Sequence, residues 1–154
     1  MSDFTLREGR SSDRPFLLEV LALSALASYP ALEKLGRLSL RTTLEAFHAQ
    51  YDVPGKRVWI AEREGIRAAG LWGIPSIHPI LEEPELLIVA IATLPEYRGQ
   101  GLAHALLDHA ATHARQERMV AIRLFANPEN AAAMALYRSL GFAPLSIELR
   151  KALI

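Results

Sequence analysis

Between an apolar run and a helical pattern lies the segment Tyr97-Arg98-Gly99-Gln100-Gly101-Leu102-Ala103, around which the rest of the chain can be interpreted. The apolar run, residues 86–92, predicts a buried strand that ends before Pro95. Apolar residues recur at helical spacing from Leu102 to Ala110, so a helix begins at the second glycine. The first N–H groups of a helix have no intrahelical partner and lie at the positive end of its dipole. Because glycines let an anion approach the backbone, the segment predicts a phosphate-binding turn.

Two other phosphate-binding loops do not match this segment. The Walker loop places Gly-Lys-Ser or Gly-Lys-Thr four residues after its first glycine, and no such run occurs in the sequence. The dinucleotide fingerprint requires three glycines after the first strand of a βαβ unit. Here two glycines come late in the chain, and position 104 is histidine. The sequence therefore indicates neither of these nucleotide-binding loops.

The glycine segment resembles the pyrophosphate-binding signature of the GNAT superfamily of N-acetyltransferases. That signature is Gln/Arg-x-x-Gly-x-Gly/Ala, which Arg98, Gly101 and Ala103 match. A second segment, residues 127–142, is similar to the other GNAT signature, in which an asparagine opens a helix, a tyrosine follows two turns later and Gly-Phe closes it. The two motifs stand in the family's order and at about its separation.

The second motif also has a local physical basis. Asn130 and Tyr137 are seven residues apart, so both lie on one face of the predicted helix. Gly141 supplies the left-handed residue that ends a helix, and Pro144 prevents its continuation. The resemblance is close over residues 86–142, whereas the N-terminal half matches the family only as a pattern of elements.

The whole pattern predicts one domain over residues 1–154, with the element order β-α-α-β-β-β-α-β-α-β. A hairpin followed by a strand–helix–strand crossover implies a mixed, mostly antiparallel sheet of about six strands. This α/β (α+β) arrangement matches the GNAT fold, whose sheet, as the resemblance implies, is splayed at a cofactor cleft. We expect strands over 4–7, 57–62, 66–74, 86–92, 119–125 and 146–149, and a loop over 75–84. Helices are expected over 14–28, over 102–117 and from residue 130, and one or two further helical pieces between the first of these helices and residue 50.

The composition limits the class of protein. A length of 154 residues, 51% of them hydrophobic, suffices for one domain with a core. The formal net charge of zero argues against a nucleic-acid-binding protein, which usually carries a basic excess. The absence of cysteine excludes disulfides and thiolate chemistry. Because residues 1–4 show no leader pattern and no apolar run reaches membrane-spanning length, we expect a cytoplasmic protein without a membrane partner.

The resemblance implies that acetyl-CoA is the cosubstrate and that backbone groups hold most of it. The N–H groups of the glycine turn would bind the pyrophosphate, with Arg98 beside it. The backbone of Ile91 and Thr93 would pair with the pantetheine arm like an added strand, one N–H facing the acetyl carbonyl, and Asn130 would bond the arm from the opposite helix. A surface arginine and a plain helix cap are the alternative interpretations of Arg98 and Asn130. The expected cofactor-binding residues are Ile91, Thr93, Arg98, Gly99, Gln100, Gly101, Leu102, Ala103 and Asn130.

Acetyl transfer to an amine needs a group that stabilises or protonates the leaving thiolate and a base that makes the amine neutral. Tyr137 suits the first task, because a phenol with a pKa near ~10 is protonated at neutral pH; a packed core tyrosine fits this helix as well. For the base, strand alternation puts Glu85 on the face of Ile91, from which it would act through water. His78 and His48 are the other candidates, and a solvated surface residue is the alternative for all three.

The acceptor is defined only as a class. The helical region before Gln50 and the loop before Pro84 would form its site, and they lack the dense acidic cluster that suits a polycation. We therefore expect a primary amine of a small molecule or a peptide. A non-catalytic GNAT-like module that binds acyl-CoA is the alternative function, and a nucleotide-binding regulator that uses the same turn is a weaker one.

Two further expectations concern metals and assembly. His109 and His113 are four residues apart on a predicted helix, but the zinc-protease pattern is not present and no third ligand is evident, so we expect no metal. A terminal strand over 146–149 would offer a free edge, which predicts a homodimer.

Overall fold

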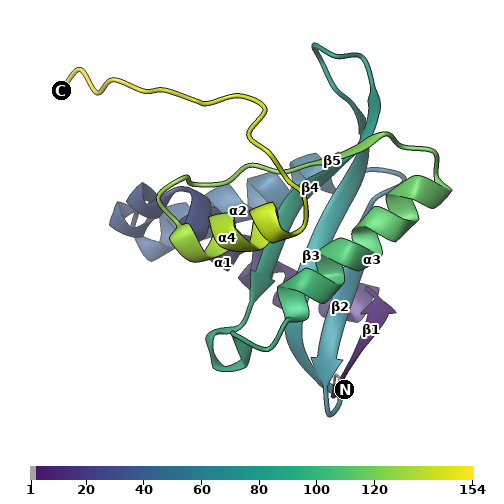
Figure 1. Cartoon of the computed structure of the whole chain (residues 1–154). Helices are drawn as coiled ribbons and strands as arrows, with labels where there is room; N and C mark the ends of the chain where they lie inside the picture. The colour runs from purple at the N-terminus through teal and green to yellow at the C-terminus, as the bar shows by residue number, and fades with distance from the viewer. Residues whose placement is uncertain (1–2) are drawn as a thin grey trace.

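A computed structural model describes residues 3–154, which form one five-stranded sheet with helices on both faces (Figure 1). The strands lie side by side in chain order, β1 to β4 antiparallel to their neighbours and β5 parallel to β4. This confirms the predicted mixed, mostly antiparallel class. Met1 and Ser2, on which the leader expectation partly rests, lie outside the described residues. The strands are β1 (Phe4–Glu8), β2 (Arg57–Arg63), β3 (Ile66–Ile77), β4 (Pro84–Thr93) and β5 (Ala121–Arg123).

The helices begin and end close to where the sequence predicts. The region expected to form one or two helical pieces up to residue 50 forms two, a short 3₁₀ turn over Pro30–Lys34 and then α2, which Gly36 precedes with extended backbone. Within residues 3–154, no helix has the length and hydropathy needed to cross a bilayer. The helices are α1 (Arg14–Ser28), α2 (Arg37–Tyr51), α3 (Leu102–Gln116) and α4 (Ala131–Ser139).

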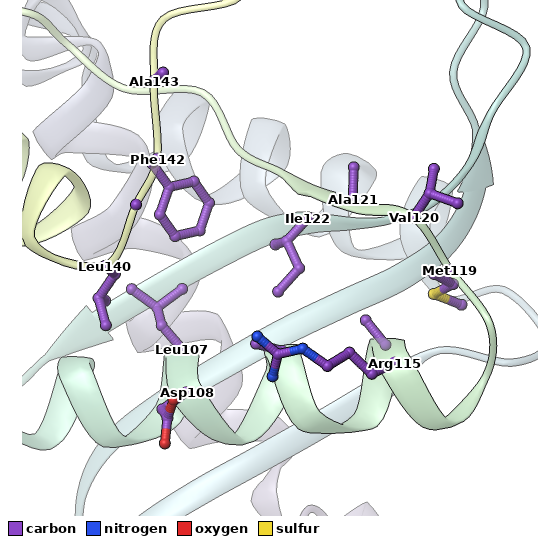
Figure 2. A pocket seen from close by; sticks show the side chains of 13 residues that line it. Leu107, Asp108, Arg115, Met119, Val120, Ala121, Ile122, Leu140, Phe142 and Ala143 are labelled. Atoms are coloured by element: carbon purple, nitrogen blue, oxygen red, sulfur yellow. The ribbon is translucent and has the colours of Figure 1, made fainter.

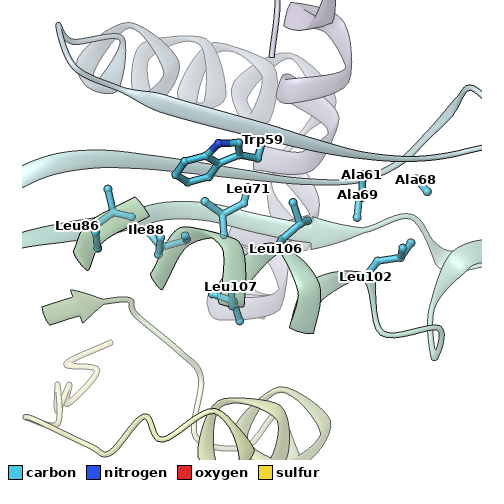
Figure 3. Close-up of a cluster of buried hydrophobic side chains, with 12 residues drawn as sticks. Trp59, Ala61, Ala68, Ala69, Leu71, Leu86, Ile88, Leu102, Leu106 and Leu107 are labelled. Carbon is cyan, nitrogen blue, oxygen red and sulfur yellow. The ribbon is translucent and has the colours of Figure 1, made fainter. Parts of the chain in front are cut away.

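The helices cover two faces of the sheet because alternate strand residues point to opposite sides. Ile60 and Trp72 join the core cluster beneath α1, whereas their neighbours Trp59 and Leu71 join the cluster beneath α3. Side chains of α4 pack against the α3-side cluster as well. Figure 3 shows that cluster, in which Trp59, Leu71, Leu86 and Ile88 of the sheet face Leu102, Leu106 and Leu107 of α3.

A bulge in β4 changes which residues face each helix layer. The pairing of β4 with β3 shifts by one residue, and Val89 is the extra β4 residue that has no partner on β3. Val89 and Ala90 both join the α1-side cluster, and Ile91 packs on the α3 side. The expectation that Glu85 and Ile91 share a face is therefore wrong, because strict alternation does not continue through a bulge.

The hairpin between β3 and β4 is longer than predicted. β3 continues to Ile77 and β4 begins at Pro84, so the expected loop over 75–84 shrinks to a turn over 78–83. Pro75 is tolerated inside β3 because the ladder with β2 ends opposite Gly73, and a missing N–H beyond that point breaks no bond to β2.

The sixth strand predicted over 146–149 is not formed. Residues 143–154 contain neither helix nor strand, and Figure 1 shows this segment leading away from the sheet. Leu145, Ile147 and Leu149 alternate with polar residues, as in a half-buried strand, but all three are exposed. A strand also needs a partner edge, which composition does not reveal. β5 is likewise shorter than the predicted 119–125, because only Ala121–Arg123 pair with β4. The homodimer stays a prediction.

Candidate active site

The centre of the candidate site is the outer edge of β4 beyond its short pairing with β5. β5 pairs only with residues 85–87 of β4, so that within residues 3–154 no strand covers the edge from Ile88 to Thr93. Ile91 donates its backbone N–H to Ser24 Oγ of α1 at 3.2 Å. The backbone carbonyl of Thr93 accepts a hydrogen bond from Arg98 Nε at 3.3 Å. The two predicted backbone groups thus point away from β3, and single side chains rather than a strand satisfy them.

The glycine turn follows β4 directly and opens α3. A 3₁₀ turn over Pro95–Tyr97 leads into Gly99 and Gly101, whose φ angles of 76° and 81° are left-handed. Gly101 is the N-cap of α3, and within the described chain no side chain caps this helix start. A Cβ added at either glycine would meet no atom of the described residues within 4 Å. The glycines are therefore needed for the backbone conformation rather than to avoid a clash, and the space beside each of them is open.

Arg98 stands between the two parts of the site. Its side chain is exposed and uses only Nε for the bond to Thr93. A guanidinium carries five N–H donors, so the bond to Thr93 leaves four donors of Arg98 for other partners. Arg98 thus joins the β4 edge to the glycine turn and adds positive charge beside the N-terminus of α3.

Asn130 and Tyr137 lie on α4, as the second motif predicts. Asn130 caps the helix, its Oδ1 accepting the N–H of Ala133 at 3.2 Å, while the amide Nδ2 keeps its own donors. The Tyr137 ring is half-buried beside Phe142, with ring centroids 5.8 Å apart. Burial raises the pKa of the Tyr137 phenol above its usual range. The phenol is therefore protonated at neutral pH, as a proton or hydrogen-bond donor must be.

Glu85 and His78 are two of the predicted bases, and in the structure each of them is bound to a different partner. Glu85 is 2% exposed, and its Oε1 accepts two hydrogen bonds from Arg123 of β5, at 2.9 Å from Nε and 2.7 Å from Nη2. His78 Nδ1 accepts the N–H groups of Ile80 and Leu81 in the β3–β4 turn. Figure 1 shows this turn at the end of the sheet opposite the glycine turn. With about 3.3 Å per residue along β4, His78 lies roughly 30 Å away from that turn, so the structure does not bring the two together.

His48, the third candidate base, is buried on α2. Its ring packs edge-on against Trp72, with centroids 4.9 Å apart. Burial, with a smaller contribution from Arg14, lowers the pKa of His48 below its usual value. His48 is therefore neutral at pH 7, and its contacts are those of a core residue.

A cavity of about 370 Å³ is lined by α3, by residues 119–122 and by residues 140–143. Figure 2 shows it between α3, β5 and the chain that follows α4. Its lining includes Leu107, Arg115, Ile122 and Phe142, whereas the predicted cofactor residues lie on β4, the glycine turn and α4. We place the candidate site at the β4 edge because outward-facing backbone groups and an open helix N-terminus meet there.

Sequence reasoning missed two features of this site, the bulge at Val89 and the contact of Ser24. The bulge has no sequence signal, because Val89 continues an unbroken apolar run. Ser24 does have one: it lies four residues after Val20, which is fully buried, and so on the inner face of α1. A hydroxyl on the inner face of a helix usually has a specific partner.

Known proteins resemble large parts of this chain. The model of the acetyltransferase (GNAT) family matches residues 25–142. Mycothiol acetyltransferase of Kocuria rhizophila is 32% identical over 122 residues, which cover 77% of this chain and 39% of that protein. Human N-acetyltransferase 8B is 31% identical over 106 residues, covering 68% of this chain and 47% of that protein. The ribosomal protein bS18-alanine N-acetyltransferase of Escherichia coli K12 is 38% identical over 68 residues, covering 44% of this chain and 45% of that protein.

The matched part is less than half of each of these relatives. Solved structures share the fold at lower identity. The ribosomal-protein-alanine N-acetyltransferase of Brucella melitensis biovar Abortus 2308 has a TM-score of 0.69 at 17% identity, covering 97% of this chain and 99% of that one. A predicted acetyltransferase of Clostridium acetobutylicum, solved with acetyl-CoA, has a TM-score of 0.71 at 19% identity, covering 97% and 96%. With a family match that spans far more than half of its residues, this chain belongs to the acetyltransferase (GNAT) family.

Proposed function

We propose that this chain transfers the acetyl group of acetyl-CoA to a primary amine of a small molecule or peptide. The observation that carries the proposal is the β4 edge, where Ile91 N–H and Thr93 C=O point outward beside the helix start at Gly101. A strand edge pairs with an extended chain of amides, and a helix N-terminus binds phosphate. Coenzyme A joins an amide-bearing pantetheine arm to a pyrophosphate, so one molecule fits both features.

Each part of the cofactor has a candidate partner in this arrangement. The backbone N–H groups of residues 99–103 bind the pyrophosphate, and the free guanidinium donors of Arg98 add charge there. Ile91 and Thr93 pair with the pantetheine arm. Asn130 donates from Nδ2 to the same arm while its Oδ1 keeps the helix capped. The amide therefore serves as cap and as ligand at once.

The chemistry follows from the donors that face the reacting group. Ile91 N–H stabilises the negative charge that develops on the acetyl oxygen as the amine adds to its carbon. Tyr137 donates to the sulfur as the carbon–sulfur bond breaks. Glu85 is not proposed as the base for the amine proton, because it is 2% exposed, bonded to Arg123 and separated from the face of Ile91 by the bulge.

The class of acceptor is supported by the names of the relatives. One of them acetylates an alanine of a ribosomal protein, as its name states, and another is named for mycothiol. A peptide amine and a small-molecule amine are thus both represented among proteins similar to this chain. We propose a primary amine of either kind.

The test is an amine screen with two readouts, release of coenzyme A thiol and the mass of the product. The panel contains simple alkyl amines, amino-acid amides and peptides with an N-terminal alanine. We expect thiol release that depends on the amine and a product that carries one acetyl group. Binding of acetyl-CoA without acetylation of any amine would instead support the non-catalytic acyl-CoA-binding module.

A further inference from the structure

The Ser24 hydroxyl touches the β4 edge at the point where the proposed function puts the acetyl group. Ser24 lies on α1, is half-buried, and its Oγ accepts the N–H of Ile91 at 3.2 Å. Hydrogen bonds between N–H and oxygen are most often about 2.9–3.0 Å long, so this one lies at the long end of the usual range. Ser24 satisfies a backbone donor that would otherwise lack a partner at an uncovered strand edge.

The proton of the Ser24 hydroxyl is not used in the way typical of helices. A helical serine or threonine commonly donates to the carbonyl four residues earlier. Thr42, Thr43 and Thr112 do this here, at 2.9, 2.9 and 3.2 Å. Among the hydrogen bonds of residues 3–154, Ser24 appears only as an acceptor. Its O–H is therefore available to a group that approaches the β4 edge.

We propose that Ser24 is a catalytic residue whose hydroxyl acts with Ile91 N–H as a second donor to the acetyl oxygen. The inference rests on the proposed function. Two donors whose heavy atoms lie 3.2 Å apart are close enough to bond one oxygen. Without ligand, the N–H of Ile91 is satisfied by Oγ; with ligand, the acetyl oxygen takes the place of Oγ in front of the N–H, and the Ser24 side chain rotates to donate its O–H to the same oxygen. Only the side chain moves in this exchange, since the peptide plane fixes the direction of the N–H.

Ser24 and Ile91 only stabilise charge in the transfer and give up no proton. The amine lone pair forms the bond to the acetyl carbon, and the π pair of the carbonyl moves onto its oxygen, which takes both hydrogen bonds. When the carbonyl reforms, the carbon–sulfur bond breaks and its electron pair leaves on sulfur. Tyr137 stabilises that thiolate, and the amine proton leaves to solvent. Atoms and charge balance without a further reactant.

The first test compares Ser24→Ala with the wild type and with Thr112→Ala, which removes a helical hydroxyl from an exposed position of α3. Because loss of one oxyanion donor lowers kcat about 10²–10³-fold, we expect a loss of about 10²-fold for Ser24→Ala. Thr112→Ala should match the wild type, and Ser24→Thr should recover most of the rate. The Kd for free coenzyme A, which has no acetyl oxygen, should stay within about twofold of the wild type. An unchanged kcat overturns the inference, as does an equal loss of coenzyme A affinity, which marks a structural role.

A second readout does not depend on turnover. Acetyl-CoA labelled with ¹³C at the carbonyl is bound to each variant without an amine, and the NMR shift of that carbon reports the hydrogen bonds to its oxygen. We expect the bound carbon of Ser24→Ala to move upfield of the wild type and that of Thr112→Ala to coincide with it. Identical shifts in all three proteins overturn the inference even if transfer is observed. A wild type that binds acetyl-CoA with this Ser24-dependent shift yet acetylates no amine removes the proposed function and keeps the Ser24 contact.

Discussion

Replacing Tyr137 with phenylalanine isolates the role of one oxygen atom. The ring remains, so its contacts with Phe142 and with the core beneath α3 are kept. The hydroxyl is then missing where the leaving sulfur gathers charge. A hydrogen bond to a charged group contributes about 1.5–3 kcal/mol, and its loss in the transition state lowers the rate roughly 10- to 150-fold. We expect kcat to fall by about 30-fold and the free energy of unfolding to change by less than about 0.5 kcal/mol.

Single-turnover kinetics with enzyme in excess over acetyl-CoA measure this loss in the chemical step rather than in product release. Tyr51→Phe is the matched control, because it removes the same atom from a ring that packs on Phe47 of α2. Burial raises the pKa of Tyr137, so the phenol stays protonated and the ratio of wild-type to variant rates should be constant between pH 7 and pH 9. Calorimetry should give the same Kd for coenzyme A in both proteins. A single-turnover rate equal to that of the wild type would refute the reasoning, and a parallel loss of affinity would assign the hydroxyl to binding.

The other predictions concern buried charges. Asp13 is fully buried and accepts hydrogen bonds from Arg7 at 2.8 and 2.9 Å and from Arg67 at 2.6 Å, which hold its pKa well below the usual range. Its stabilisation is therefore complete above the unfolded pKa near ~3.9 and is lost as the pH falls through the folded pKa. Asp13→Asn should lower the free energy of unfolding by about 3 kcal/mol in urea at pH 7 and by clearly less at pH 3; an equal effect at both pH values contradicts the ionic role. Glu85→Ala should cost about 3 kcal/mol because it leaves the partly buried Arg123 without its carboxylate. Adding Arg123→Leu should recover part of that loss, and strictly additive losses would show that the pair is not coupled.

Much of the fold could be predicted because local chemistry and tertiary structure agree. The extent of α1 and the glycine turn before α3 each depend on rules that act within a few residues. The incorrect predictions concern features that depend on pairing with another segment of the chain. The pattern over 146–149 is that of a strand, but pairing needs an edge that no local rule supplies. The bulge at Val89 arises from register against β3, which one strand does not encode.

The candidate site likewise contains residues that local sequence predicts and residues that only the tertiary structure places. The groups in the two motifs could be named from their spacing, because glycine, a helix cap and a helix face are local features. The base could not, since Glu85 was placed on the face of Ile91 by an alternation that the bulge interrupts, and its bond to Arg123 joins segments far apart in the sequence. Ser24 was missed because its partner is a backbone N–H on another element.

The most direct test of the account is calorimetric titration of acetyl-CoA, coenzyme A and ATP into the wild type and into Gly101→Glu. Any residue but glycine is strained at this φ of 81°, and a carboxylate there would repel the pyrophosphate, so circular dichroism must first show that the variant is folded. We predict that the wild type binds acetyl-CoA and coenzyme A in preference to ATP and that the folded variant loses this binding. A folded wild type that does not bind acetyl-CoA, or a folded variant that binds it equally well, would contradict the account.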